Sequence, residues 1–167
     1  MVLIGMPGTG KSTVGDVLAR RLGYRLIDTD AMIVQTFGHS LPELIASHGV
    51  DNFLQMEGHV GQQLDCDGCV IATGGSMVFS EPAMLHLRSI GTVVWMDTPL
   101  QELERRIAKS GDRGIAAEKG VSLASIDAVR RPLYRQYAHI HIPCAGNKGG
   151  VVQRILDALT DWHAQEP

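Results

Sequence analysis

The chain has 167 residues, a length that suits one domain and allows a substantial buried core. Hydrophobic residues make up 44% and charged residues 20%, the balance of a globular protein and not of a disordered chain. A formal net charge of -3, with no run of Lys and Arg, argues against a nucleic-acid-binding protein. The apolar runs are too short for a membrane span and no signal peptide is apparent, so we expect a cytoplasmic protein. We also expect a monomer.

Apolar runs of strand length alternate with stretches of helical periodicity, which is the pattern of βαβ units around a parallel sheet. We expect strands over residues 2–5, 25–28, 70–73, 92–97 and 139–143. We expect helices over residues 13–21, from 42 onward, and over 52–64, 81–90, 99–109, 122–137 and 150–162. The interval 110–121 is rich in Gly and charge, which predicts a mobile loop. No repeat or linker divides the chain, so a single domain over residues 1–167 is expected.

The three cysteines do not suggest a disulfide framework. Cys66 and Cys69 have C-x-x-C spacing around Asp67-Gly68, a dipeptide typical of a turn. No second pair completes the four ligands of a zinc site. We therefore expect a surface turn before a strand, and a redox or metal role for the pair stays as the alternative.

The segment Gly5-Met6-Pro7-Gly8-Thr9-Gly10-Lys11-Ser12 matches the phosphate-loop pattern G-x-x-x-x-G-K-[ST] at every fixed position. It lies between an expected strand and an expected helix, as that pattern requires. Glycines let backbone N–H groups surround phosphate oxygens, and the helix directs its N-terminus at the same anion. Lys11 then meets the β/γ-phosphates and the Ser12 hydroxyl binds Mg²⁺. The residues expected to bind ATP here are Gly8, Thr9, Gly10, Lys11, Ser12 and Thr13.

Polar and glycine residues follow two further expected strands. Asp28 and Asp30 come at the end of the second strand, and Gly74-Gly75 follow the third. Ligands of open α/β sheets bind at these carboxyl ends, so both segments are candidates for a second binding site. Asp30 also precedes an apolar helical stretch, and an N-cap is the alternative interpretation of this residue.

In order and spacing, these segments resemble the shikimate kinase family over nearly the whole chain, together with the arginine-bearing loop 105–113 and Arg-Arg-Pro-Leu-Tyr at 130–134. The resemblance implies a three-layer α/β sandwich with five parallel strands in the order 2-3-1-4-5, a phosphate loop and a mobile lid. It also implies transfer of the ATP γ-phosphoryl group to a hydroxyl of shikimate, a step of aromatic amino acid biosynthesis.

The resemblance assigns a role to each matching residue. Lys11, Asp30 and Arg113 would be catalytic, with Asp30 acting on the acceptor hydroxyl and Arg113 closing over the phosphoryl group. Ser12 and Asp28 would help to bind Mg²⁺. Arg106, Asn147 and Lys148 would contact the adenine. The acceptor would be bound by Asp30, Phe53, Glu57, Gly74, Gly75 and Arg130, the last gripping its carboxylate. Arg113 and Arg131 could instead be solvated charges.

The chain departs from the family at three places. The usual Phe-Arg-x-x-Glu reads Phe53-Leu54-Gln55-Met56-Glu57, so one arginine of the carboxylate clamp is missing. Ser76 replaces a third glycine, and Gly114-Ile115 replaces Pro-Leu after Arg113. Either Arg131 swings in to restore the clamp for shikimate, or the acceptor is another small alcohol, such as one with an amino group for Glu57. A non-catalytic ATP-binding regulator is a third hypothesis, which the intact Asp28/Asp30 pair disfavours.

Overall fold

The structure is a computed structural model that describes residues 1–110, 115 and 120–164. Its strands are β1 (Val2–Ile4), β2 (Arg25–Asp28), β3 (Cys69–Ala72), β4 (Val93–Asp97) and β5 (Ile140–Pro143). Its α-helices are α1 (Lys11–Leu22), α2 (Thr29–Phe37), α3 (Leu41–Gln62), α4 (Glu81–Ile90), α5 (Leu100–Ser110), α6 (Leu123–Tyr137) and α7 (Lys148–His163). A 3-10 helix, η1, spans Met77–Phe79. None of the helices within the described residues is long and apolar enough to cross a membrane.

The five strands form one parallel sheet in the order β2-β3-β1-β4-β5, as the resemblance implies. β1 lies at the centre, where Val2 pairs with Ile71 of β3 on one side and Val93 of β4 on the other. Because all the strands are parallel, the loops that follow β1, β2 and β3 gather at the same edge of the sheet. In an open α/β sheet this edge is where ligands bind.

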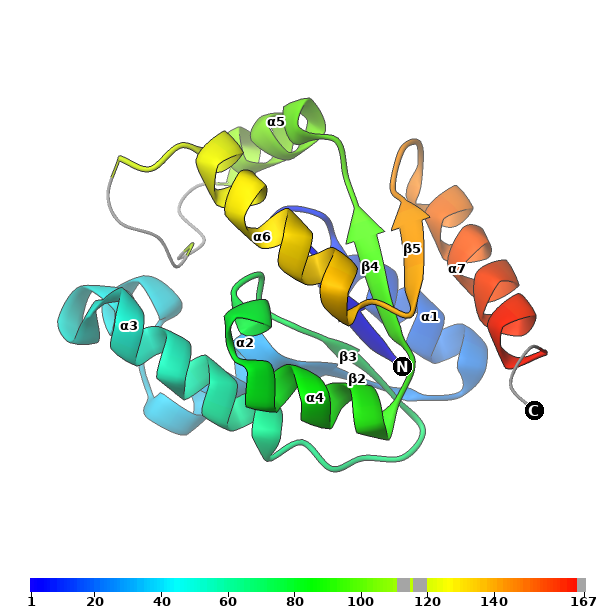
Figure 1. Cartoon of the computed structure of the whole chain (residues 1–167), viewed down its shortest axis with the longest axis horizontal. Coiled ribbons are helices and arrows are strands. Elements are labelled where there is room, and N and C mark those ends of the chain that lie inside the picture. Colours follow the sequence, from blue (N-terminus) through cyan, green and yellow to red (C-terminus); the bar gives the residue numbers. More distant parts are fainter. Residues whose placement is uncertain (111–114, 116–119, 165–167) are drawn as a thin grey trace.

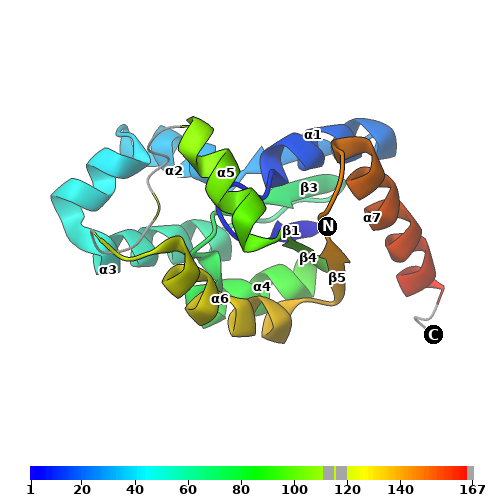
Figure 2. The same ribbon diagram turned by 90° about the horizontal axis from the view of Figure 1, so that it is seen from above.

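Helices cover both faces of the sheet, which gives the expected three layers. Figure 2 shows α1 and α7 on one face and α4 and α6 on the other, while Figure 1 shows α3 extending beyond the sheet. The first face is closed by an apolar cluster that includes Leu3, Leu18 and Val152, all 0% exposed. The opposite face is closed by a cluster around Ile4, Met84 and Leu87, also 0% exposed. Burial of these two apolar faces holds the loops of the sheet edge in place.

The region after β2 differs from the expectation in two respects. The helices expected from Pro42 and over 52–64 are one segment, α3, which bends at Gly49, where φ is 79° and ψ is 166°. Its start is fixed by a capping box between Ser40 and Glu43. The N-cap after β2 is Asp28, whose Oδ1 accepts from the backbone N–H groups of Asp30 and Ala31, at 3.0 and 3.3 Å. Asp30 itself lies in the first turn of α2, so the alternative interpretation of Asp30 as an N-cap was wrong.

The expectation of no disulfide was also wrong, because Cys66 and Cys69 are disulfide-bonded. The expected turn is present, with Asp67 and Gly68 exposed between them and Gly68 at a φ of 60°. Cys69 is buried as the first residue of β3, so the pair closes the turn onto the core instead of lying on the surface. C-x-x-C spacing permits this bond, but spacing alone does not distinguish a bonded pair from a free one.

Candidate active site

The phosphate loop joins β1 to α1 and has the backbone that the motif requires. Gly10, the N-cap of α1, has a φ of 94°, a left-handed conformation that residues with a Cβ rarely adopt. A Cβ on Gly5 would lie 2.5 Å from the carbonyl oxygen of Met96 on β4, so only glycine lets the loop pass this close to the neighbouring strand. The loop therefore ends at the N-terminus of a twelve-residue helix, a favourable position for an anion.

Lys11 is the first residue of α1 and its side chain curls back under the loop. Its Nζ donates to the carbonyl oxygens of Gly5 and Met6, at 2.7 and 3.0 Å. The side chain is only 7% exposed, and burial lowers the pKa of Lys11 to about 8 against the opposing effect of Asp30. The ammonium is thus held inside the site, where a phosphate group would replace loop carbonyls as its partner.

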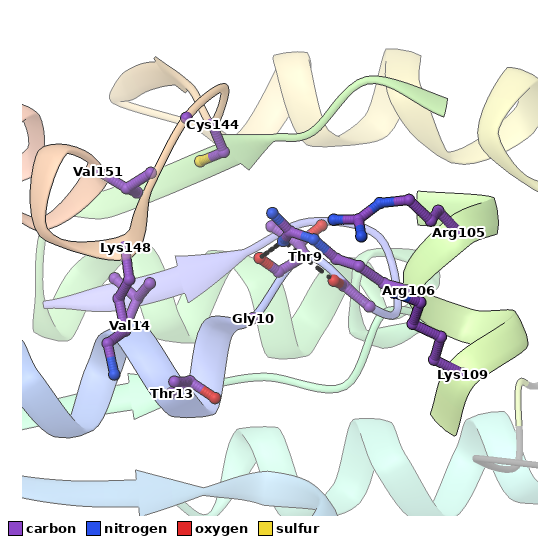
Figure 3. Close-up of a pocket in the computed structure, with 12 residues that line it drawn as sticks. Thr9, Gly10, Thr13, Val14, Arg105, Arg106, Lys109, Cys144, Lys148 and Val151 are labelled. Carbon is purple, nitrogen blue, oxygen red and sulfur yellow. Dashed lines mark hydrogen bonds between the residues drawn. The ribbon is translucent and has the colours of Figure 1, made fainter. Parts of the chain in front are cut away.

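A cavity of about 400 Å³ opens on one side of the loop (Figure 3). Cations from two elements surround it, Arg105, Arg106 and Lys109 from α5 and Lys148 from α7. Its remaining lining residues are Gly8, Thr9, Gly10, Thr13, Val14, Cys144, Gly146 and Val151. Positive side chains beside a phosphate loop suit a polyphosphate, and the apolar side chains suit a flat base.

Arg106 ties α5 to the phosphate loop. Its NH1 donates to the carbonyl oxygens of Thr9 at 3.0 Å and Gly8 at 3.4 Å, and its Nε donates to Glu102 at 2.7 Å (Figure 3). Arg106 and Lys148 both line the cavity, as predicted for the nucleotide site. Asn147 caps α7, where its Oδ1 accepts from the backbone N–H of Gly150 at 2.8 Å, and it is not among the described residues that line the cavity.

A second cavity, of about 130 Å³, lies on the other side of the loop. All six residues predicted for the acceptor line it, brought together from α2, α3, α6 and the loop after β3: Asp30, Phe53, Glu57, Gly74, Gly75 and Arg130. Lys11 and Ser12 line it too, and Gly8, Gly10 and Thr13 line both cavities, so the two cavities meet at the phosphate loop. A small molecule in this cavity would lie beside the phosphate loop.

The glycine pair after β3 forms the wall between the charged side chains. A Cβ on Gly74 would lie 2.0 Å from Glu57 Oε1 and 2.7 Å from Asp30 Oδ1. A Cβ on Gly75 would lie 2.7 Å from Pro7 and 3.1 Å from Arg130 NH1. Glycine is therefore required at both positions for the carboxylates and the guanidinium to approach.

Two buried hydroxyls hold this glycine pair, and the sequence analysis assigned neither of them a role. Thr29 is 0% exposed, and its Oγ1 accepts from the backbone N–H of Gly74 at 2.9 Å. Tyr134 donates to the carbonyl oxygen of Gly75 at 2.7 Å. Tyr134 lies one helical turn after Arg130 on α6, and this i, i+4 spacing was the one pattern that could have found it.

The comparisons with known proteins agree with this geometry. The family model for shikimate kinase matches residues 7–160. A shikimate kinase of Synechococcus sp. (strain RCC307) is 40% identical over 164 residues, which cover 95% of this chain and 83% of that protein. The chain belongs to the shikimate kinase family. It is therefore an ATP-dependent phosphotransferase that acts on a hydroxyl group.

Solved structures of shikimate kinases have the same fold. A shikimate kinase from Acinetobacter baumannii, in complex with shikimate, superimposes with a TM-score of 0.87 at 29% identity, covering 96% of this chain and 92% of that one. A shikimate kinase from Aquifex aeolicus superimposes with a TM-score of 0.80 at 30% identity, covering 95% of each chain.

The residues present fit a Mg²⁺ ion, which kinases generally use with ATP. Ser12 is exposed at the phosphate loop and Asp28 is at the end of β2, and both offer the hard oxygen ligands that Mg²⁺ prefers. Among the described residues, no group of three or more His, Cys, Asp or Glu could hold a metal by itself. Mg²⁺ usually keeps several waters and binds substrate phosphates beside one or two protein ligands, so a sparse protein site is what we expect.

Asp30 and Glu57 are the two carboxylates of the acceptor cavity in this member of the shikimate kinase family. Burial raises the pKa of Asp30, opposed by the charge of Lys11. Burial also raises the pKa of Glu57 to about 7, opposed by a hydrogen bond from Ser76. Glu57 is 1% exposed, and its Oε2 has no hydrogen-bond partner among the described residues. Ser76, the departure from the third glycine, thus lies beside Glu57.

The missing clamp arginine is not replaced by Arg131. Arg131 donates to Asp97 at 2.9 Å and to Asp127 at 3.1 Å, and its guanidinium lies over the Trp95 ring, 5.4 Å from the centroid. These partners lie outside the residues that line the acceptor cavity. Leu54 packs in the apolar cluster between α2 and α3, next to Phe53. The predicted catalytic arginine, Arg113, and most of the lid at 110–121 lie outside the described residues, although Ile115 lines the acceptor cavity.

Proposed function

We propose that this chain transfers the γ-phosphoryl group of ATP to a hydroxyl of shikimate. The observation that carries the proposal is the acceptor cavity, where buried Arg130 and Lys11 and half-buried Asp30 surround one small space beside the phosphate loop. The relatives at up to 40% identity are shikimate kinases, and the Acinetobacter enzyme was solved with shikimate.

At the donor end, the phosphate loop and the N-terminus of α1 bind the triphosphate, and Lys11 leaves its carbonyl partners to meet the β/γ-phosphates. Ser12 and Asp28 would hold Mg²⁺, which neutralises phosphate charge when bound. The base lies in the larger cavity, against Arg106 and Lys148, with Asn147 beside it at the start of α7.

At the acceptor end, Arg130 binds the carboxylate of the substrate. Its side chain is 2% exposed, and its guanidinium lies over the Phe79 ring, 5.4 Å from the centroid. The N–H groups of Arg130 are therefore held in a fixed direction. Asp30 then orients the hydroxyl and takes its proton as the oxygen attacks the γ-phosphorus. Burial, which raises the pKa of Asp30, makes this carboxylate a better proton acceptor than an exposed one.

The remaining part of the proposal rests on the family pattern. Arg113 would close over the transferring phosphoryl group and stabilise its charge. We propose a monomer as the active unit. We propose the cytoplasm as its location because ATP is its substrate, although a disulfide such as Cys66–Cys69 is rare in that compartment.

The test is release of ADP and formation of a phosphorylated product, followed by mass spectrometry, with shikimate as the acceptor. The matched control acceptor is the methyl ester of shikimate, which keeps the hydroxyls but removes the charge that Arg130 binds. We expect turnover of shikimate and a value of kcat/KM lower by roughly 10- to 150-fold for the ester. ATP binding without transfer to shikimate would contradict the proposal and favour a non-catalytic regulator.

A further inference from the structure

The acceptor cavity contains one charged group that the proposed reaction does not use. Four charged side chains line it among the described residues, Lys11, Arg130, Asp30 and Glu57. Lys11 serves the phosphates, Arg130 the substrate carboxylate and Asp30 the reacting hydroxyl. A simple hydroxy acid carries no group that would pair with Glu57.

Glu57 is placed to receive a cation. Its carboxylate is 1% exposed, Oε1 lies against Gly74 in the wall of the cavity, and Oε2 has no hydrogen-bond partner among the described residues. A buried carboxylate without a full set of partners costs free energy, on the order of 1–3 kcal/mol for an unsatisfied group and more when charged. Ser76 already hydrogen-bonds this carboxylate, so Oε2 is the atom that still lacks a donor.

Among residues 1–110, 115 and 120–164, no side chain donates to Oε2 of Glu57. Position 54, where the family pattern has an arginine, is Leu54, and it packs with Phe53 in an apolar cluster. Leu54 and Glu57 are three residues apart on α3, so they share a face of the helix and a cation at position 54 would be a neighbour of Glu57. Arg131 is held outside the cavity by Asp97 and Asp127.

We propose that this cavity also accepts a small amino acid that carries a side-chain hydroxyl. Its ammonium group meets Glu57, its carboxylate meets Arg130 and its hydroxyl meets Asp30. Each charged group of the cavity then has a partner of opposite charge or, for Asp30, a proton to accept. Because the phosphoryl donor is unchanged, the inference rests on the proposed ATP-dependent phosphotransfer.

The reaction is the same as with a hydroxy acid. The acceptor oxygen forms a bond to the γ-phosphorus, and the bond from this phosphorus to the bridging oxygen breaks. ADP leaves with that electron pair, and Asp30 takes the proton of the hydroxyl. The product is a phosphate ester of the amino acid, with its ammonium and carboxylate groups intact.

The experiment compares acceptors that differ only in the amino group. L-Serine, L-homoserine and L-5-hydroxynorvaline are paired with 3-hydroxypropanoate, 4-hydroxybutanoate and 5-hydroxypentanoate, and shikimate is assayed beside them with the full chain and ATP-Mg²⁺. We expect at least one amino acid to be phosphorylated with a kcat/KM roughly 10- to 150-fold above that of its amine-free partner. The inference is overturned if no amino acid exceeds its partner, whereas the proposed function fails separately if shikimate is not phosphorylated.

Two variants test the assigned partner of the ammonium. Glu57→Gln should bring the amine-to-amine-free ratio of kcat/KM close to one, and circular dichroism checks that it folds. Leu54→Arg places an internal cation beside Glu57 and should lower the same ratio, while Leu54→Met, which keeps the packing without a charge, should not. A ratio that survives in both Glu57→Gln and Leu54→Arg would overturn the assignment to Glu57.

Discussion

A Cβ placed on Gly74 would lie 2.0 Å from the Oε1 of Glu57. The same Cβ would be 2.7 Å from the Oδ1 of Asp30, so one methyl group would push against both carboxylates of the acceptor cavity. Neither carboxylate can move away easily, because Glu57 is almost fully buried and Asp30 lies in the first turn of α2.

We therefore predict that Gly74→Ala reduces acceptor turnover by at least about tenfold, through a distorted Asp30, while ATP binding changes little. Steady-state kinetics and nucleotide titration would measure the two effects. The control is Gly149→Ala, an exposed helical position where a Cβ meets no atom closer than 3.6 Å. An unimpaired Gly74→Ala enzyme would show that the close approach has no functional role.

Lys11→Ala should abolish phosphoryl transfer and leave the fold intact. The ammonium acts on the phosphates, whereas its present partners are carbonyl oxygens of its own loop. Burial lowers the pKa of Lys11, which means that its positive charge does not stabilise the folded chain. The thermal stability of the variant should therefore not fall. Near-normal activity of the variant, measured by ADP release, would refute the role of the phosphate loop.

Asp30→Asn should lower kcat strongly while the affinity for ATP persists, because this carboxylate acts on the acceptor hydroxyl. Asp28→Ala provides the contrast, since Asp28 caps α2. Its loss should reduce stability by about 0.5–2 kcal/mol, measured by urea denaturation, whereas Asp30→Asn keeps the cap. If Asp30→Asn instead lost ATP affinity and kept kcat, Asp30 would belong to the nucleotide site.

Leu54→Arg should lower the KM for shikimate by roughly 10- to 150-fold, with kcat little changed, because a second guanidinium would meet the carboxylate and Glu57 lies beside it. Arg131→Ala is the control, and it should leave this KM unchanged because Arg131 binds Asp97 and Asp127. A rise in KM for Arg131→Ala would mean that Arg131 enters the cavity when the acceptor binds.

The pKa of Glu57 predicts a pH dependence of stability. Burial raises this pKa from 4.5 to about 7, so the folded chain binds a proton that the unfolded chain releases. The stabilising contribution is complete below pH 4.5 and is lost as the pH rises toward 7, on the order of 3 kcal/mol. Glu57→Gln has no such titration, so urea denaturation should show wild type losing stability relative to it over this range. A constant difference between the two proteins would contradict the assignment.

Local sequence signals indicated the elements of the fold and the phosphate loop. The strands could be predicted from the period of hydrophobicity and the phosphate loop from a run of fixed residues, whereas the order of the sheet was implied by the resemblance to the family. The six residues predicted for the acceptor came from the family pattern, and the structure brings all six to one cavity.

The directions of side chains were decided only by the tertiary structure. Arg130 and Arg131 are adjacent, yet successive residues of a helix point about 100° apart, so only one of them can face the cavity. The packing of α6 on the sheet directs Arg130 inward and leaves Arg131 to Asp97 and Trp95. The tertiary structure also decided three other features, namely the cap at Asp28, the disulfide of Cys66 and Cys69 and the unsatisfied oxygen of Glu57. Each depends on which groups meet in space, and no local pattern of residue types specifies that.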